Sequence, residues 1–89
     1  MEHELTPERV VGLLRELLGD ILELAPDEVG LHQDLIDELD ADSLQRLELM
    51  TEAEHRLDVR LDARAWREAR TLAELAELTL RGLAEPRPR

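Results

Sequence analysis

The sequence predicts an all-α fold, a four-helix bundle, from its composition, its periodicity and its length. Apolar residues are nearly all Leu, Ala, Val and Ile, Trp66 is the single aromatic residue, and Glu and Arg are abundant. This composition is typical of helices, and apolar residues recur at spacings of three and four rather than in alternation. A chain of 89 residues fits one small domain. We expect that domain to span residues 1–84, with a disordered tail over 85–89 because its prolines prevent a helix.

The first helix is predicted to begin at Thr6-Pro7 and to end before Pro26. Threonine is a favourable N-cap, proline is tolerated at the first helical position, and a residue that precedes a proline is pushed away from helical geometry. The pattern predicts an amphipathic helix of about five turns. Its apolar residues at helical spacing are Val10, Leu13, Leu14, Leu17, Ile21 and Leu24.

A long connection over residues 25–42 separates this helix from the next. Connections longer than about 12–15 residues are uncommon in compact domains and are usually functional or disordered. Its scattered apolar residues indicate an ordered loop that is pinned to the core, with a single helical turn near residues 34–39. This loop delivers the chain to Ser43, where the second helix is predicted to begin.

The second helix is predicted over residues 43–57, and its helical wheel separates a core stripe from an outward face. With Leu44 at 0° and about 100° per residue, the core stripe lies opposite Leu44. It holds Leu49, Met50, Ala53 and Leu57. Leu47 lies at the edge of the stripe, whereas Glu48 and Glu52 flank Leu44. An exposed pair of leucines ringed by acids favours a docking surface, although a single exposed leucine needs no explanation.

Two further helices complete the predicted bundle. A short third helix over residues 63–70 contains Trp66. The fourth helix begins at Thr71, because Thr71-Leu72-Ala73-Glu74 has the pattern of a capping box. One face of this helix is lined by Leu72, Leu75, Ala76, Thr79 and Leu83.

The net charge, and the absence of certain residue types, exclude some classes of function. A net charge of −11 argues against nucleic acid as a partner, because phosphates attract the opposite charge. Residues 1–55 hold 16 acidic residues and 3 Arg, which form either a solvated surface or a face that steers basic partners. The chain has no Cys, three scattered His and no apolar run of about 20 residues. We therefore expect a cytoplasmic monomer without a disulfide, a metal site or a membrane span.

The lone serine, Ser43, lies among carboxylates at the predicted start of the second helix. It either caps that helix or presents a hydroxyl that another protein modifies. A third alternative, a nucleophile activated by His55, is disfavoured, because 12 residues of one helix separate the two side chains by about 18 Å. We therefore expect that the chain is not an enzyme.

The segment Asp37-Glu38-Leu39-Asp40-Ala41-Asp42-Ser43-Leu44, continuing through Leu47-Glu48-Leu49 to Leu57-Asp58, resembles the acyl carrier proteins. The resemblance implies that Ser43 carries 4′-phosphopantetheine, attached covalently from coenzyme A by a phosphopantetheinyl transferase. The thiol of this arm would hold acyl groups as thioesters for acyltransferase, synthase or ligase partners with basic docking surfaces. The face implied for these partners comprises Asp40, Asp42, Leu44, Leu47, Glu48 and Glu52.

Several positions depart from the pattern of that family. Asp40 stands where glycine is common, and aspartate is among the residues that tolerate a positive φ. Thr51 and Glu52 replace residues that are usually apolar in fatty-acid carriers, Ala53 is small for a core position, and Leu57 replaces a customary phenylalanine. These differences favour a discrete carrier for polyketide or related specialised biosynthesis, with a short or polar cargo. The alternatives are an aminoacyl or peptidyl carrier, a fatty-acid carrier, and an unmodified helical interaction module.

Overall fold

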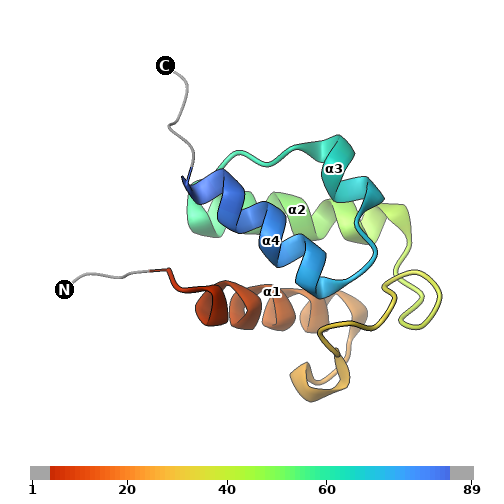
Figure 1. The fold of residues 1–89 in the computed structure, drawn as a ribbon. Helices are drawn as coiled ribbons and strands as arrows, with labels where there is room; N and C mark the ends of the chain where they lie inside the picture. The colour runs from red at the N-terminus through yellow and green to blue at the C-terminus, as the bar shows by residue number, and fades with distance from the viewer. Residues whose placement is uncertain (1–4, 85–89) are drawn as a thin grey trace.

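The computed structural model describes residues 5–84, and this part of the chain folds into helices and connecting loops without a strand (Figure 1). The predicted all-α bundle is therefore confirmed, and the predicted tail, residues 85–89, lies outside the described residues. The elements in chain order are α1 (Pro7–Leu22), the 3₁₀ helix η1 (Pro26–Glu28), α2 (Ser43–Leu57), α3 (Ala63–Glu68) and α4 (Leu72–Ala84).

Local hydrogen bonds fix both ends of α1. The Thr6 hydroxyl accepts a hydrogen bond from the Arg9 N–H at 3.2 Å, as expected of an N-cap. At the other end Glu23 adopts the left-handed conformation, with a φ of 61°. The Leu24 N–H donates to the Gly19 carbonyl at 2.8 Å, which is the hydrogen bond that spans six residues in a Schellman motif. The helix therefore ends at Leu22. The prediction that the helix includes Leu24, which was based on apolar spacing, is wrong.

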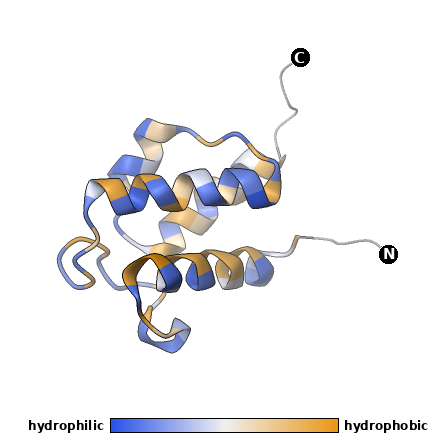
Figure 2. Cartoon of the chain, turned by 180° about the vertical axis from the view of Figure 1, so that it is seen from behind, coloured by the Kyte–Doolittle hydropathy of each residue, from blue (hydrophilic) through white to orange (hydrophobic). Residues whose placement is uncertain are grey.

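The hydrophobic core lies where α1 packs against α2 and α4, while α3 links α2 to α4 (Figure 1). Helix α1 turns its hydrophobic side toward the other helices and its hydrophilic side away (Figure 2). On α2 the predicted stripe is buried at Leu49, Met50 and Ala53, whereas Leu57 is only partly buried. The largest fully buried side chains are those of Trp66, Leu14, Leu18, Leu35, Leu49, Leu72, Leu75, Val10, Val29 and Thr79.

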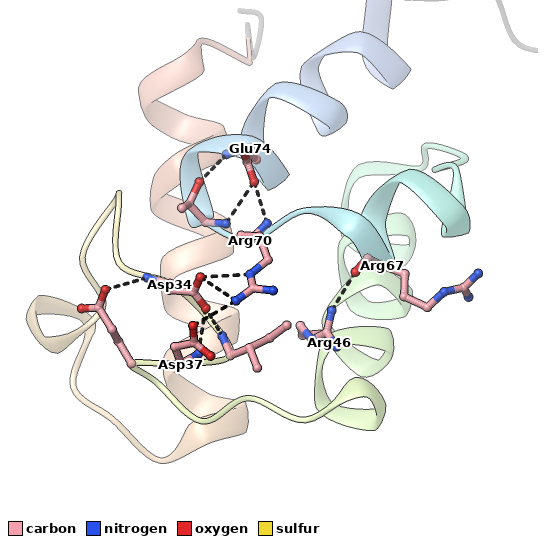
Figure 3. Close-up of polar contacts among 9 residues, drawn as sticks. Asp34, Asp37, Arg46, Arg67, Arg70 and Glu74 are labelled. Carbon is pink, nitrogen blue, oxygen red and sulfur yellow. Dashed lines mark hydrogen bonds and ion pairs between the residues drawn. The ribbon is translucent and has the colours of Figure 1, made fainter.

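The connection between η1 and α2 is ordered by contacts with the link between α3 and α4. Leu35 is fully buried, and its N–H donates to the Arg70 carbonyl at 2.7 Å. The Arg70 guanidinium lies between two carboxylates of the loop, 2.9 Å from Asp34 and 3.2 Å from Asp37 (Figure 3). Hydrogen bonds from the Asp37 N–H and from Arg70 hold the pKa of Asp34 below its ordinary value of 3.8, against the opposing effect of partial burial. Arg70 thus clamps the loop that leads to α2.

This clamp predicts acid sensitivity. Because the pKa of Asp34 is lower in the folded protein than in the unfolded chain, its ionised form stabilises the fold at every pH above 3.8. The contribution is lost as the pH falls below 3.8 through the folded-state pKa. We expect Asp34→Asn to be less stable than the parent protein at neutral pH and to lose less stability on acidification. Urea unfolding at a series of acidic to neutral pH values measures both the stability and its loss on acidification, with Glu16→Gln on α1 as the control. Curves of stability against pH that run parallel for the parent protein and Asp34→Asn would contradict the prediction.

Candidate functional site

The serine at the start of α2 is not the residue that caps the helix. Asp42 is the N-cap: its carboxylate accepts a hydrogen bond from the Gln45 N–H at 2.7 Å, and the Gln45 side-chain oxygen accepts one from the Asp42 N–H at 3.0 Å. These two bonds form a capping box. Ser43 is the first residue of the helix, and its side chain is exposed. The interpretation of Ser43 as a simple N-cap is therefore wrong, because its neighbour performs that role.

The Ser43 hydroxyl differs from every other side-chain hydroxyl of the chain, which has one serine, four threonines and no tyrosine. Thr6 and Thr71 accept hydrogen bonds from backbone N–H groups at helix starts, each at 3.2 Å. Thr51 and Thr79 donate to the backbone carbonyls four residues before them, at 3.1 Å and 2.8 Å. Within residues 5–84 Ser43 alone has a hydroxyl without a hydrogen-bond partner. It is the one free alcohol of the structure.

The backbone just before Ser43 is fixed by an unusual turn. Asp40 has a φ of 60°, the left-handed conformation that the sequence comparison with the carrier pattern anticipated for this position. The next residue, Ala41, is buried, and its N–H donates to the Leu35 carbonyl at 2.9 Å. Because Leu35 is also bonded to Arg70, the clamp on the loop extends to the entry of α2. Ser43 is thus held on a defined corner.

The outward face of α2 has the exposure that the helical wheel predicts. Leu44 is 72% exposed and Leu47 is 49% exposed, although both are large hydrophobic residues. Glu48 and Glu52 are exposed beside them, and Glu52 lies 4.0 Å from Arg56 one turn later. Asp40 and Asp42 are exposed as well, although the carboxylate of Asp42 is engaged in the capping box. The six predicted partner residues therefore surround the entry and the outer side of α2.

A groove opens beside Ser43, between α2 and α3. Its volume is about 240 Å³, and it is lined by five residues of α2, including Ser43 and Leu44, and by three residues of α3, including Trp66 and Arg67. Most of its lining side chains are apolar. An elongated organic group attached to the Ser43 hydroxyl would begin at the rim of this groove.

The sequence analysis missed one residue of the groove, Arg46. It is only 8% exposed, and its guanidinium donates a hydrogen bond to the Arg67 carbonyl at 2.9 Å (Figure 3). In return the buried Trp66 indole N–H donates to the Arg46 carbonyl at 2.9 Å, so two hydrogen bonds join α2 to α3. The wheel carried the signal: counted from Leu44, Arg46 falls at about 200°, in the middle of the core stripe.

The described residues were also searched for a metal site, a membrane-spanning helix and a histidine close to Ser43. No group of three or more His, Cys, Asp or Glu within 5–84 is arranged to hold a metal ion. None of the helices in this range is both long and apolar enough to cross a membrane. His55 is exposed near the far end of α2 from Ser43. The site is thus a single presented hydroxyl next to a groove.

A helical bundle with a free hydroxyl at a helix start is suited to carry a covalently attached group. Comparison with protein families found a match to the phosphopantetheine attachment site family over residues 12–79. The chain therefore belongs to this family of carrier domains, whose prosthetic group is covalently attached 4′-phosphopantetheine. Such domains generally carry intermediates for catalytic partners and are themselves not catalysts. Among curated proteins, none matched the chain significantly.

The residues around Ser43 fit this prosthetic group. The N–H groups of Ser43 and Leu44 donate to no protein acceptor within the described range, as is usual for the first turn of a helix. Free N–H groups and the positive end of the helix dipole favour a phosphate at this position. The carboxylate of Asp42, the residue before Ser43, opposes a phosphate here because both are negative. The groove between α2 and α3 offers room for the chain that follows the phosphate.

Proposed function

We propose that Ser43 is the attachment residue and that the protein carries acyl intermediates on it as thioesters. The observation that supports this proposal most is that Ser43 has the only side-chain hydroxyl without a hydrogen-bond partner in residues 5–84. In the proposed modification, the Ser43 oxygen bonds to the phosphorus of coenzyme A that bears pantetheine. The pyrophosphate bond of coenzyme A breaks, its adenosine bisphosphate part leaves, and a base of the transferase takes the serine proton.

We propose that partner enzymes dock on the outward face of α2. Leu44 and Leu47 supply exposed apolar area, and Glu48 and Glu52 supply negative charge beside it. Asp40 and Asp42 extend that charge to the entry of the helix. Acidic surfaces attract basic partners and accelerate their association. A phosphopantetheinyl transferase and the acyltransferase, synthase or ligase enzymes of the pathway would share this surface.

The pathway that we propose is polyketide or other specialised biosynthesis, with a short or polar cargo. Thr51 and Glu52 are exposed and polar on α2, and Ala53 is a small residue of the core. A polar helix face and a cationic side chain in the groove are poorly suited to a long alkyl chain. An aminoacyl or peptidyl carrier and a fatty-acid carrier are the alternatives, and an unmodified interaction module is the outcome if Ser43 is not modified.

Intact-mass measurement tests the attachment residue. After incubation with coenzyme A, Mg²⁺ and a transferase of broad specificity, we expect the parent protein to gain one phosphopantetheine and Ser43→Ala to gain none. Thr51→Ala is the matched control, because it removes another exposed hydroxyl of α2 and should be loaded like the parent. Circular dichroism should show Ser43→Ala folded, since Asp42 caps the helix. No gain in the parent protein, or an undiminished gain in Ser43→Ala, would reject the proposal.

A further inference from the structure

Arg70 joins the start of α4 to the loop that precedes α2, although it lies far from Ser43 in the sequence. Its own backbone is anchored at α4, because its N–H donates to the Glu74 carboxylate at 2.6 Å (Figure 3). Its guanidinium reaches the loop, where two of its nitrogens, Nε and Nη2, each lie 2.9 Å from one carboxylate oxygen of Asp34. Nη2 also lies 3.2 Å from Asp37. Arg70 therefore holds the loop from a fixed point on the helical bundle.

The carboxylate that Arg70 holds also shapes the turn over residues 34–39. The second oxygen of Asp34 accepts hydrogen bonds from the N–H groups of Ile36 and Asp37, at 2.9 Å and 2.7 Å. An aspartate that bonds to the backbone just after it in this way stabilises a turn. The Asp34 carbonyl in addition accepts hydrogen bonds from the N–H groups four and five residues later, at 3.0 Å and 3.2 Å. Asp34 thus orders the turn, and Arg70 fixes Asp34.

A short series of backbone contacts leads from this turn to Ser43. The N–H of the buried Leu35 donates to the Arg70 carbonyl at 2.7 Å, and its carbonyl accepts a hydrogen bond from the Ala41 N–H at 2.9 Å. Ala41 is buried and directly precedes Asp42, the N-cap of α2. Within residues 5–84 no hydrogen bond holds the Ser43 hydroxyl itself. Its position therefore depends on the backbone that leads to it.

We propose that Arg70 is a positioning residue for the modification of Ser43, because the loop that it holds sets where the hydroxyl stands when the transferase acts. This inference rests on the proposed function, in which the Ser43 oxygen bonds to the phosphorus of coenzyme A that bears pantetheine. The pyrophosphate bond breaks, adenosine bisphosphate leaves with the bonding electron pair, and a base of the transferase takes the serine proton. A displacement of the reacting atoms by about 1 Å can cost roughly 100-fold in rate.

The exposure of Arg70 separates this role from a contribution to global stability. Its side chain is 47% exposed, and ion pairs of such exposed side chains contribute little to the stability of a whole domain. Their loss is instead felt where they order a segment that has no regular structure of its own. We therefore expect removal of the guanidinium to loosen the loop and to slow the modification of Ser43 while the helical bundle stays folded.

Arg70→Gln tests the proposal, because it removes the charge but keeps the backbone bonds of residue 70. In the unmodified protein, we expect hydrogen exchange of the Ala41 N–H to accelerate by about tenfold through local opening. Exchange of the Val59 N–H, which donates to the Glu54 carbonyl after the end of α2, should stay unchanged. This measurement does not depend on the transferase.

The second measurement is the rate of loading, followed by intact mass with coenzyme A, Mg²⁺ and a transferase of broad specificity. For Arg70→Gln we expect kcat to fall on the order of tenfold and KM to stay within about twofold of the parent value, because the docking face on α2 is unchanged. Arg64→Gln removes the same charge from an exposed position on α3 and should load like the parent. Circular dichroism checks that each variant is folded at the assay temperature.

Two further variants test the contact itself. Arg70→Lys should restore part of kcat, because lysine returns the charge without the planar fork that reaches both carboxylates. Adding Asp34→Asn to Arg70→Gln should lower kcat little further, since the two residues act through one contact. A full additional loss would show that Asp34 and Arg70 act separately and would overturn the proposal.

Three other results would also overturn the positioning role. An unchanged kcat in Arg70→Gln would show that the ordered loop is not needed for the modification. A raised KM at constant kcat would assign Arg70 to docking, and equally accelerated exchange at Ala41 and Val59 would assign it to global stability. If the parent protein gains no arm, the proposed function fails and the positioning role fails with it, whereas the exchange measurement still shows whether Arg70 orders the loop.

Discussion

Replacing Trp66 with alanine is expected to lower the free energy of unfolding by about 3–5 kcal/mol, the usual cost of removing a buried aromatic side chain. Trp66 is 2% exposed, it is the only aromatic residue of the chain, and its indole N–H bonds α3 to the Arg46 carbonyl of α2. A domain of this size is stable by roughly 0.05–0.15 kcal/mol per residue, so this loss removes a large part of its total stability. Urea unfolding followed by circular dichroism at 222 nm measures the change, because the tryptophan signal is lost with the residue.

Trp66→Phe separates the packing of the ring from its hydrogen bond. Phenylalanine keeps most of the apolar volume but cannot donate to the Arg46 carbonyl, which then loses the contact measured at 2.9 Å. We expect a smaller loss than for alanine, about 1–2 kcal/mol, from one missing hydrogen bond and a partial cavity. A Trp66→Ala protein that unfolds within about 0.5 kcal/mol of the parent would show that α3 contributes little to the core.

The elements of the fold could be predicted because local physics determines them. The start of α1 follows from a threonine before a proline, and the start of α4 follows from the capping box of Thr71 and Glu74. The second helix spans residues 43–57 both in prediction and in structure. The end of α1 was placed too late, because the apolar spacing continues to Leu24 although Glu23 already leaves the helical conformation. Periodicity shows which side of a helix is buried, but not where a left-handed residue stops it.

Whether Asp42 or Ser43 caps α2 was harder to predict, although the sequence contains the residue pattern that distinguishes them. Asp42 and Ser43 are both good N-cap residues and stand next to each other. A capping box needs Glu or Gln three residues after the cap, and only Asp42 has one, Gln45. Three residues after Ser43 stands Arg46, which cannot accept the hydrogen bond. The assignment of the cap to Asp42 leaves the Ser43 hydroxyl free, which is the feature that the proposed function needs.

Contacts between residues far apart in the sequence could not be predicted from local sequence patterns. Arg70 bonds to Asp34, which lies 36 residues earlier in the chain, and the local sequence around either residue does not predict the other as its partner. The pairing depends on how α1, α2 and α4 pack, and therefore on the fold as a whole. The groove beside Ser43 arises in the same way, from α3 lying against α2. Helical wheels describe one helix at a time, so they find a buried arginine but not the cavity that it lines.

The second large effect is expected at the docking face. Glu48→Arg should lower kcat/KM for loading by a phosphopantetheinyl transferase on the order of tenfold, because charge reversal slows the encounter with a basic surface. Leu44→Ala should lower it by a similar factor through lost apolar contact, since Leu44 is the most exposed of the large hydrophobic residues in the described range. Rates are measured at carrier concentrations below KM, with helicity checked by circular dichroism.

Salt and a matched variant distinguish the two causes. The effect of Glu48→Arg should shrink as ionic strength rises, because exposed charges are screened over about 8 Å at 0.15 M salt. The effect of Leu44→Ala should persist, since apolar contact does not depend on screening. Glu16→Arg changes the net charge by the same amount from an exposed position on α1, and it should leave the rate near that of the parent. If Glu16→Arg and Glu48→Arg slow loading equally, the partner senses the overall charge of the protein, and the outward face of α2 is not its docking surface.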